Sequence, residues 1–135
     1  MTAGDLARSY LVKAGKRLRI LEVLFDEEDY SDVVREAQEI VELCLKGMLR
    51  SVGIEPPKWH DVGQFLIEYE ERFSGVIHED LVKAAKISKA LRRDRELAFY
   101  GDVDFIPTEE FTRDSGVEAI NGAKFVLDIA RRVIG

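Results

Sequence analysis

Apolar residues recur at spacings of three and four along almost the whole chain, and no run alternates strictly between apolar and polar residues. A period near 3.6 residues is that of an α-helix with one buried face, whereas strict alternation is that of a strand. The stripes predict five helical segments and no sheet, at about residues 3–26, 31–52, 61–73, 78–100 and 115–134.

Residues that commonly begin or end helices stand at several of these boundaries. Ser31 follows an acidic stretch and is expected to cap the second helix, and Gly53 stands where a C-terminal glycine would. Gly101 is expected to end the fourth helix in the same way. Ser115, with Glu118 three residues later, has the pattern of a capping box, so the last helix is expected to begin there.

The predicted fold class is all-α. We expect one domain over residues 1–135, an up-and-down helical bundle of about five helices, three of them long and one or two short. The connection over residues 101–113 is expected to hold one further turn of helix after Pro107. A chain of 135 residues is long enough to bury a core of its own.

Composition describes a water-soluble globular protein, with 46% hydrophobic and 34% charged residues. No apolar stretch approaches the length of a membrane span, so no membrane partner is expected. The lone cysteine, Cys44, fits a reducing cytoplasm and is expected to be a small buried hydrophobe. The net charge of −6 argues against general adhesion to nucleic acid, so any such role needs a local basic patch.

Several kinds of catalytic or binding site are missing from the sequence. No glycine-rich loop leads into Lys-Ser or Lys-Thr, and no Glu-x-x-His pair is present. His60 and His78 stand on different elements and, with one cysteine, cannot complete a zinc set. No serine is singled out as a nucleophile. We therefore expect neither a metal nor a cofactor.

The fourth predicted helix gathers positive charge on one side. Lys83, Lys86, Lys89 and Arg93 follow one another at spacings of three, three and four, and Tyr100 comes seven residues after Arg93. At 100° per residue these side chains point in similar directions. Two interpretations stay open: a solvated face balanced by acidic neighbours, or a groove that holds phosphates and stacks a base on the tyrosine.

The order of motifs resembles the HEPN domain, the higher-eukaryote and prokaryote nucleotide-binding helical family. Members typically carry Ala-Gln on a helix, then a Glu and a Lys four apart, a proline-containing loop, and a His-Asp pair that opens the next helix. The corresponding residues here are Ala37, Gln38, Glu42, Lys46, Pro56, Pro57, His60 and Asp61. Further on, Arg93, Ala98 and Tyr100 fall on the family's Arg-x4-His-x-Tyr signature, with alanine in place of histidine.

This resemblance implies a ribonuclease site that has lost its proton donor. In nuclease members, arginine and histidine from two protomers are understood to cut RNA without metal. An imidazole exchanges protons near neutral pH and an arginine stabilises the phosphorane charge. Ala98 has no proton to exchange. His78 stands about twenty residues away, roughly 30 Å along one helix, and His60 is expected to pack or cap at a loop–helix junction.

The resemblance also implies partners. Such proteins are often encoded beside a minimal nucleotidyltransferase in toxin–antitoxin-like pairs, and the enzyme can modify the family's tyrosine, here Tyr100. We therefore expect a homodimer that associates with a nucleotide, with RNA or with that enzyme. The alternative is an active metal-independent endoribonuclease that uses Arg93 and Tyr100. Glu42 and Lys46 have the i, i+4 spacing of a structural ion pair.

Overall fold

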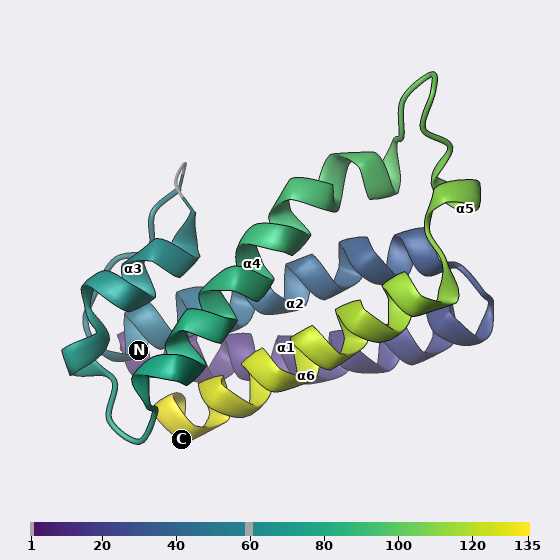
Figure 1. Cartoon of the computed structure of the whole chain (residues 1–135). Helices are drawn as coiled ribbons and strands as arrows, with labels where there is room; N and C mark the ends of the chain where they lie inside the picture. Colours follow the sequence, from purple (N-terminus) through teal and green to yellow (C-terminus); the bar gives the residue numbers. More distant parts are fainter. Residues whose placement is uncertain (1, 59–60) are drawn as a thin grey trace.

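The computed structural model describes residues 2–58 and 61–135 and contains helices joined by short loops (Figure 1). His60, which the sequence analysis singled out, lies outside the described residues. The helices are α1 (Ala3–Asp26), α2 (Tyr30–Ser51), α3 (Val62–Glu68), α4 (His78–Phe99), α5 (Pro107–Glu110) and α6 (Arg113–Ile134), with a 3₁₀ turn, η1, at Glu70–Arg72.

The all-α prediction is confirmed. α1, α2, α4 and α6 each have 22 to 24 residues, so the four longest predicted segments are all long helices, and the expected count of three was one too low. The third segment is shorter than predicted, because α3 ends after Glu68 and only the 3₁₀ turn continues towards Phe73. The turn expected after Pro107 is α5. None of the helices in the described residues is long and apolar enough to cross a bilayer.

Two predicted helix starts are wrong by one to three residues. α2 begins at Tyr30 with Asp29 as its N-cap, and Ser31 is a buried residue inside the first turn. The Asp29 side chain makes no cap hydrogen bond. The pKa of Asp32 is raised to about 6, first by burial and then by its hydrogen bond with Asp29.

The start of α6 departs from its prediction in a similar way. The capping box there joins Thr112 to Ser115, and Arg113 is the first helical residue. Thr112 and Ser115 each accept a hydrogen bond from the backbone of the other, so the motif is the one predicted, shifted three residues towards the N-terminus.

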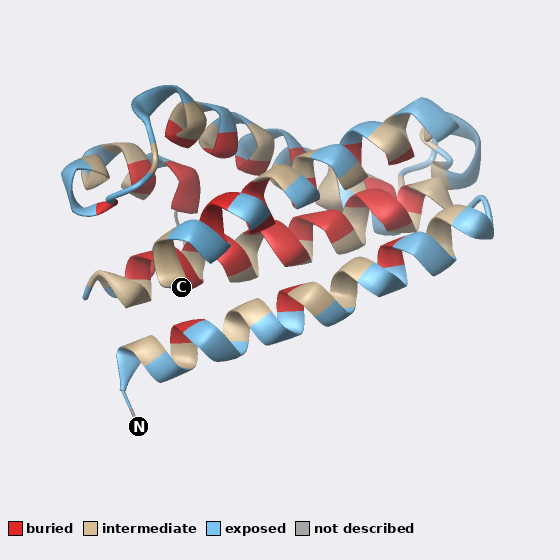
Figure 2. Cartoon of the chain, turned by 90° about the horizontal axis from the view of Figure 1, so that it is seen from below, coloured by how far each residue is buried: buried red, intermediate tan, exposed pale blue. Residues whose placement is uncertain are grey.

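The central helix is α2, which contacts α1, α3, α4 and α6. Its buried residues occupy most of its circumference, whereas those of α1 form a narrow line. Figure 2 shows the buried residues on the sides of the helices that face one another, and an outer side of α1 that is open to solvent. The core is one cluster, and Cys44 is fully buried in it. Burial raises the pKa of this thiol to about 12, which excludes a reactive thiolate at neutral pH.

Helix α4 is attached to the bundle at its N-terminal half by close contact with α3. A Cβ atom on Gly63 would lie 2.9 Å from the Ala85 Cα atom, so the two backbones approach as closely as glycine allows. Towards its C-terminal end α4 diverges from α6 (Figure 1). The tight turn that follows depends on Gly101, whose φ of +67° and contacts with Phe105 and Pro107 leave no room for a side chain.

The Gly63–Ala85 contact yields a stability prediction. Gly63→Ala should lower the free energy of unfolding by about 1–3 kcal/mol, because the new methyl group forces α3 and α4 apart. Urea denaturation measures the change. Gly15→Ala on α1 is the matched control, since the nearest atom to its Cβ is the Arg131 Nη2 at 3.7 Å. That control should be neutral or stabilising by up to about 1 kcal/mol. Equal effects of the two changes would contradict the close contact.

Candidate nucleic-acid interface

The outward face of α4 carries most of the predicted site residues. The buried side of this helix is made of Leu81, Ala84, Ser88, Leu91 and Ala98. Lys86, Lys89, Arg93 and Tyr100 are all exposed on the opposite side. Three quarters of the Arg93 side chain and 70% of Tyr100 are accessible to solvent. The structure therefore brings these four residues to one surface, as the spacing predicted.

Lys83 is exposed but turned away from the others. Its ammonium group lies 4.1 Å from the centroid of the Phe125 ring on α6, a cation–π contact. Lys86 and Lys89 line a shallow hollow between α3 and α4, together with Asp61. The Asp61 carboxylate accepts a hydrogen bond from the Gly63 N–H at 3.0 Å and caps α3. Asp61 therefore has a structural role and also places a negative charge at the edge of the basic face.

Two arginines of α4 form ion pairs with glutamates of α2. The charges of α4 therefore fall into an inner set, which faces α2, and an outer set, which faces solvent. Arg92 lies 3.7 Å from Glu42 of α2, and Arg95 lies 3.3 Å from Glu39. Glu42 is also 3.4 Å from Lys46, the i, i+4 pair predicted from the sequence. These contacts tie α4 to α2. Arg93, between them in sequence, faces solvent instead.

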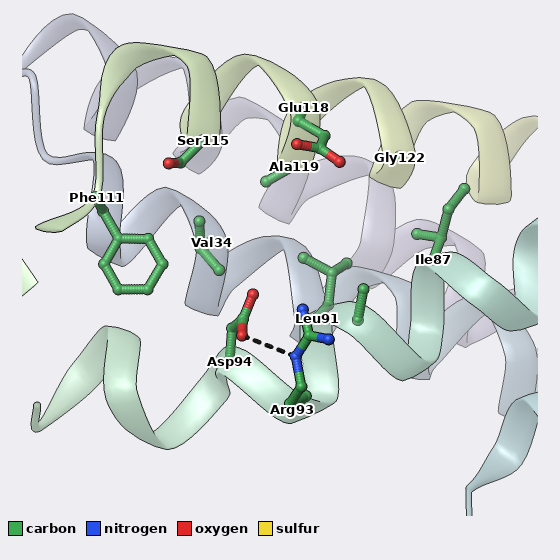
Figure 3. Close-up of a pocket in the computed structure, with 11 residues that line it drawn as sticks. Val34, Ile87, Leu91, Arg93, Asp94, Phe111, Ser115, Glu118, Ala119 and Gly122 are labelled. Carbon is green, nitrogen blue, oxygen red and sulfur yellow. Dashed lines mark hydrogen bonds and ion pairs between the residues drawn. The ribbon is translucent and has the colours of Figure 1, made fainter.

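Arg93 lies on the rim of a groove between α4 and α6, of about 220 Å³ (Figure 3). The Arg93 Nε atom is 3.3 Å from an Asp94 carboxylate oxygen. Val34 of α2, Leu91 of α4 and Ala119 of α6 line the groove with hydrocarbon. Its lining also includes Phe111, Ser115 and Glu118. A groove of mixed polar and apolar lining can accept a flat or partly apolar ligand beside the guanidinium.

The Tyr100 ring packs against the ring of Phe99, which the sequence did not single out as part of the site. The Arg35 guanidinium carbon lies 4.0 Å from the centroid of the Phe99 ring, and the Phe99 and Tyr100 rings meet edge to face at 4.8 Å. Arg35 thus ties the end of α4 to the start of α2 and orients the ring next to Tyr100. The sequence signal for this contact is the pair of consecutive aromatic residues at 99 and 100, followed by Gly101.

Position 98 does not share the surface of Arg93 and Tyr100. Ala98 is only 1% exposed and belongs to the core cluster. Five residues along a regular helix amount to a rotation of about 140°, so side chains at 93 and 98 diverge. Of the two histidines, only His78 is described. It lies at the end of α4 opposite to Tyr100, and its Nδ1 atom is 2.8 Å from a carboxylate oxygen of Glu70.

No group of three or more acidic, histidine or cysteine side chains in the described part of the chain is arranged to hold a metal ion. The outward face of α4 presents charged and aromatic side chains. A guanidinium and two ammonium groups attract phosphate, and an exposed phenol offers a ring for stacking and a hydroxyl for modification.

Comparison with known proteins places the fold. A search of curated proteins finds no match. Among solved structures, the chain is similar to TT1696 from Thermus thermophilus, with a TM-score of 0.75 and 23% sequence identity over 93% of this chain and 95% of that one. At that identity the likeness concerns the fold alone. The family model of the HEPN domain matches residues 7–133, nearly the whole chain, and the protein therefore belongs to the HEPN family.

Proposed function

We propose that this protein is a nucleotide- or RNA-associated HEPN module that binds its ligand on the outward face of α4. The observation that carries the proposal is the joint exposure of Arg93 and Tyr100, with Lys86 and Lys89 on the same side of the helix. On a chain of net charge −6, phosphate would be attracted to this face and not to the surface in general.

The module acts as the partner of a minimal nucleotidyltransferase in a toxin–antitoxin-like pair. The support is the family membership together with Tyr100, whose hydroxyl-bearing ring is accessible at the end of α4. A nucleotidyl group transferred to that hydroxyl would bring negative phosphate beside the basic residues of the face. The homodimer expected from the resemblance belongs to the same proposal.

Ribonuclease activity is weak or absent in this proposal. A general acid or base must reach the proton that it transfers, and the Ala98 side chain is buried and has no titratable group. The alternative is an endoribonuclease in which Arg93 stabilises the transition-state charge and Tyr100 takes part in proton transfer. The exposure of both residues on one face is the observation in its favour.

Binding to single-stranded RNA tests the proposal directly. Tyr100→Ala should weaken binding of a fluorescently labelled oligoribonucleotide by about tenfold, since stacking of one base on an aromatic ring is worth about 1–3 kcal/mol. Arg93→Ala should weaken it too and reduce its salt dependence. Arg19→Ala on the outer side of α1 is the control and should change nothing. The RNA should stay intact, and cleavage that disappears in Arg93→Ala would establish the alternative.

Modification of Tyr100 tests the partner. On co-expression with a nucleotidyltransferase encoded beside this gene, intact-mass spectrometry should show the addition of nucleotidyl groups, and peptide mapping should locate them at Tyr100. Tyr100→Phe should abolish the addition, because the hydroxyl is the acceptor, whereas Tyr69→Phe should leave it unchanged. An unmodified protein, or addition at another residue, would count against the pairing.

Histidine at position 98 should not create a nuclease. Ala98→His should lower the free energy of unfolding by about 1–3 kcal/mol, because an imidazole must enter a packed core. Ala90→His, exposed on the same helix, is the control and should cost less than about 1 kcal/mol. Chemical denaturation and an RNA cleavage assay measure both variants. Cleavage by a stably folded Ala98→His variant would show that side chain 98 can reach the outward face.

A further inference from the structure

The outer side of α1 exposes apolar and basic side chains together. Val12 and Val23 are each more than half exposed, and Ile20 is 44% exposed. Lys16 and Arg19 are exposed on the same side of the helix. At spacings of four, three, one and three residues, these five side chains fall on one helix face, and we call them the outer strip of α1. Figure 2 shows this side of α1, which begins at the label N, open to solvent.

Valine and isoleucine are unusual residues for the exposed face of a helix. Branching at Cβ restricts these side chains in a helix, so alanine, lysine or glutamate suits an exposed helical position better. The loss is offset where the branched side chain packs on a neighbour, and valine and isoleucine are favoured at contact positions between two packed helices. The outer strip has solvent beside it, so only a neighbour from outside the chain can offset the loss (Figure 2).

The charge of the outer strip indicates the chemistry of such a neighbour. Residues 6–21 contain five cationic residues and no acidic one, although the whole chain has a net charge of −6. Arg8 and Arg17 are neutralised by carboxylates of the same chain, at 2.6 and 2.7 Å. Lys16 and Arg19 form no ion pair with any residue that the structure describes. Acidic groups on the neighbour would therefore complement the strip.

Three other kinds of neighbour fit the outer strip less well. A second copy docked strip to strip would place Lys16 and Arg19 against their own like charges. Helices that lie on a lipid surface insert tryptophan, phenylalanine or leucine. Faces that hold single-stranded nucleic acid offer an aromatic ring for stacking. The apolar residues of the strip are valine and isoleucine only, which favours a protein partner.

We propose that the outer strip of α1 is the docking site for an acidic amphipathic helix of another protein. The aliphatic side of that helix packs on Val12, Ile20 and Val23, and its carboxylates pair with Lys16 and Arg19. Val12 and Val23 are eleven residues apart, which is about 16 Å along a helix, so about three turns of the partner cover the strip. The inference does not rest on the proposed function, because that function uses the outward face of α4.

Binding of a synthetic helix tests the docking site. The probe is a fluorescently labelled peptide of about four heptads, with leucine at positions a and d and glutamate at e and g, whose mutual repulsion keeps the peptide from pairing with itself. The wild-type protein should bind it at least about tenfold more tightly than the same peptide with lysine in place of glutamate. Fluorescence anisotropy at constant ionic strength measures both dissociation constants. Equal affinities, or no binding of either peptide, would overturn the proposal.

Charge reversal separates the outer strip from the overall charge of the protein. K16E/R19E should reverse the preference, so that the lysine peptide binds more tightly than the glutamate peptide. K58E/K124E changes the net charge by the same amount at exposed positions outside α1, and this matched control should keep the wild-type preference. If both variants lost the preference equally, the probe would be responding to net charge alone, and the docking site would be disproved.

The apolar part of the contact is tested by V12S/V23S, which keeps every charge. This variant should bind the glutamate peptide at least about tenfold more weakly, because the leucines of the probe lose their contacts. Circular dichroism should show an unchanged helix content, since both valines are exposed in the free protein. An unchanged affinity in the folded variant would contradict helix docking.

Lipid and nucleic acid are tested with the same variants. Vesicles that contain phosphatidylserine should not bind the wild-type protein, and binding of single-stranded RNA should be the same in the wild type and in K16E/R19E. Vesicle binding that K16E/R19E abolishes would assign the outer strip to an anionic lipid surface and overturn the proposal. RNA binding lost in K16E/R19E would overturn it as well, whereas RNA binding lost only in Arg93→Ala leaves both proposals standing.

Discussion

The enclosure of α2 is the constraint on which the remaining arrangement depends. This helix buries Ala37, Ile40, Cys44, Leu45 and Met48 among its neighbours, and it contacts every other long helix. Most of the hydrophobic stabilisation of a domain comes from such fully buried side chains. Because α1 and α6 cover two of its sides, α4 has to use the remaining side. The side of α4 that faces away from α2 is then exposed to solvent.

The helices α2 and α4, whose contact surface forms a seam, each bury a polar side chain. Gln38 is 2% exposed, and neither atom of its amide has a hydrogen-bond partner among the described residues. Ser88 is also buried on the α4 side. The ion pairs to Glu39 and Glu42 lie at the edge of the same seam and are partly exposed, so each contributes little to stability. The polar contacts of the C-terminal half of α4 are therefore directional rather than strong, and they add to the burial of Leu91 and Ala98 in the core. They determine which arginines face inwards.

The sequence was enough to predict the helices and the exposed face, but not their exact ends or the orientation of every side chain. Spacing of apolar residues is a property of a whole helix, so it survives one or two exceptions. A helix cap depends on single side chains, and the sequence offers two equally plausible capping boxes at this helix start. The structure has the pair of Thr112 and Ser115, not the pair of Ser115 and Glu118. Lys83 was predicted to join the basic face, yet Phe125, distant in sequence, draws its ammonium group to α6. Contacts of that kind have no local signal.

Geometry of a regular helix also explains which site residues can act together. Residues seven apart, such as Arg93 and Tyr100, return to nearly the same direction, whereas residue 98 points about 140° away from Arg93. One α4 can therefore present a guanidinium and a phenol to the same ligand, but it cannot present a side chain at position 98 beside them. The burial of Ala98 at 1% exposure agrees with this rotation. A group that takes the part of a side chain at position 98 must come from another element or from another chain, and the projecting end of α4 leaves the face open to such an approach (Figure 1).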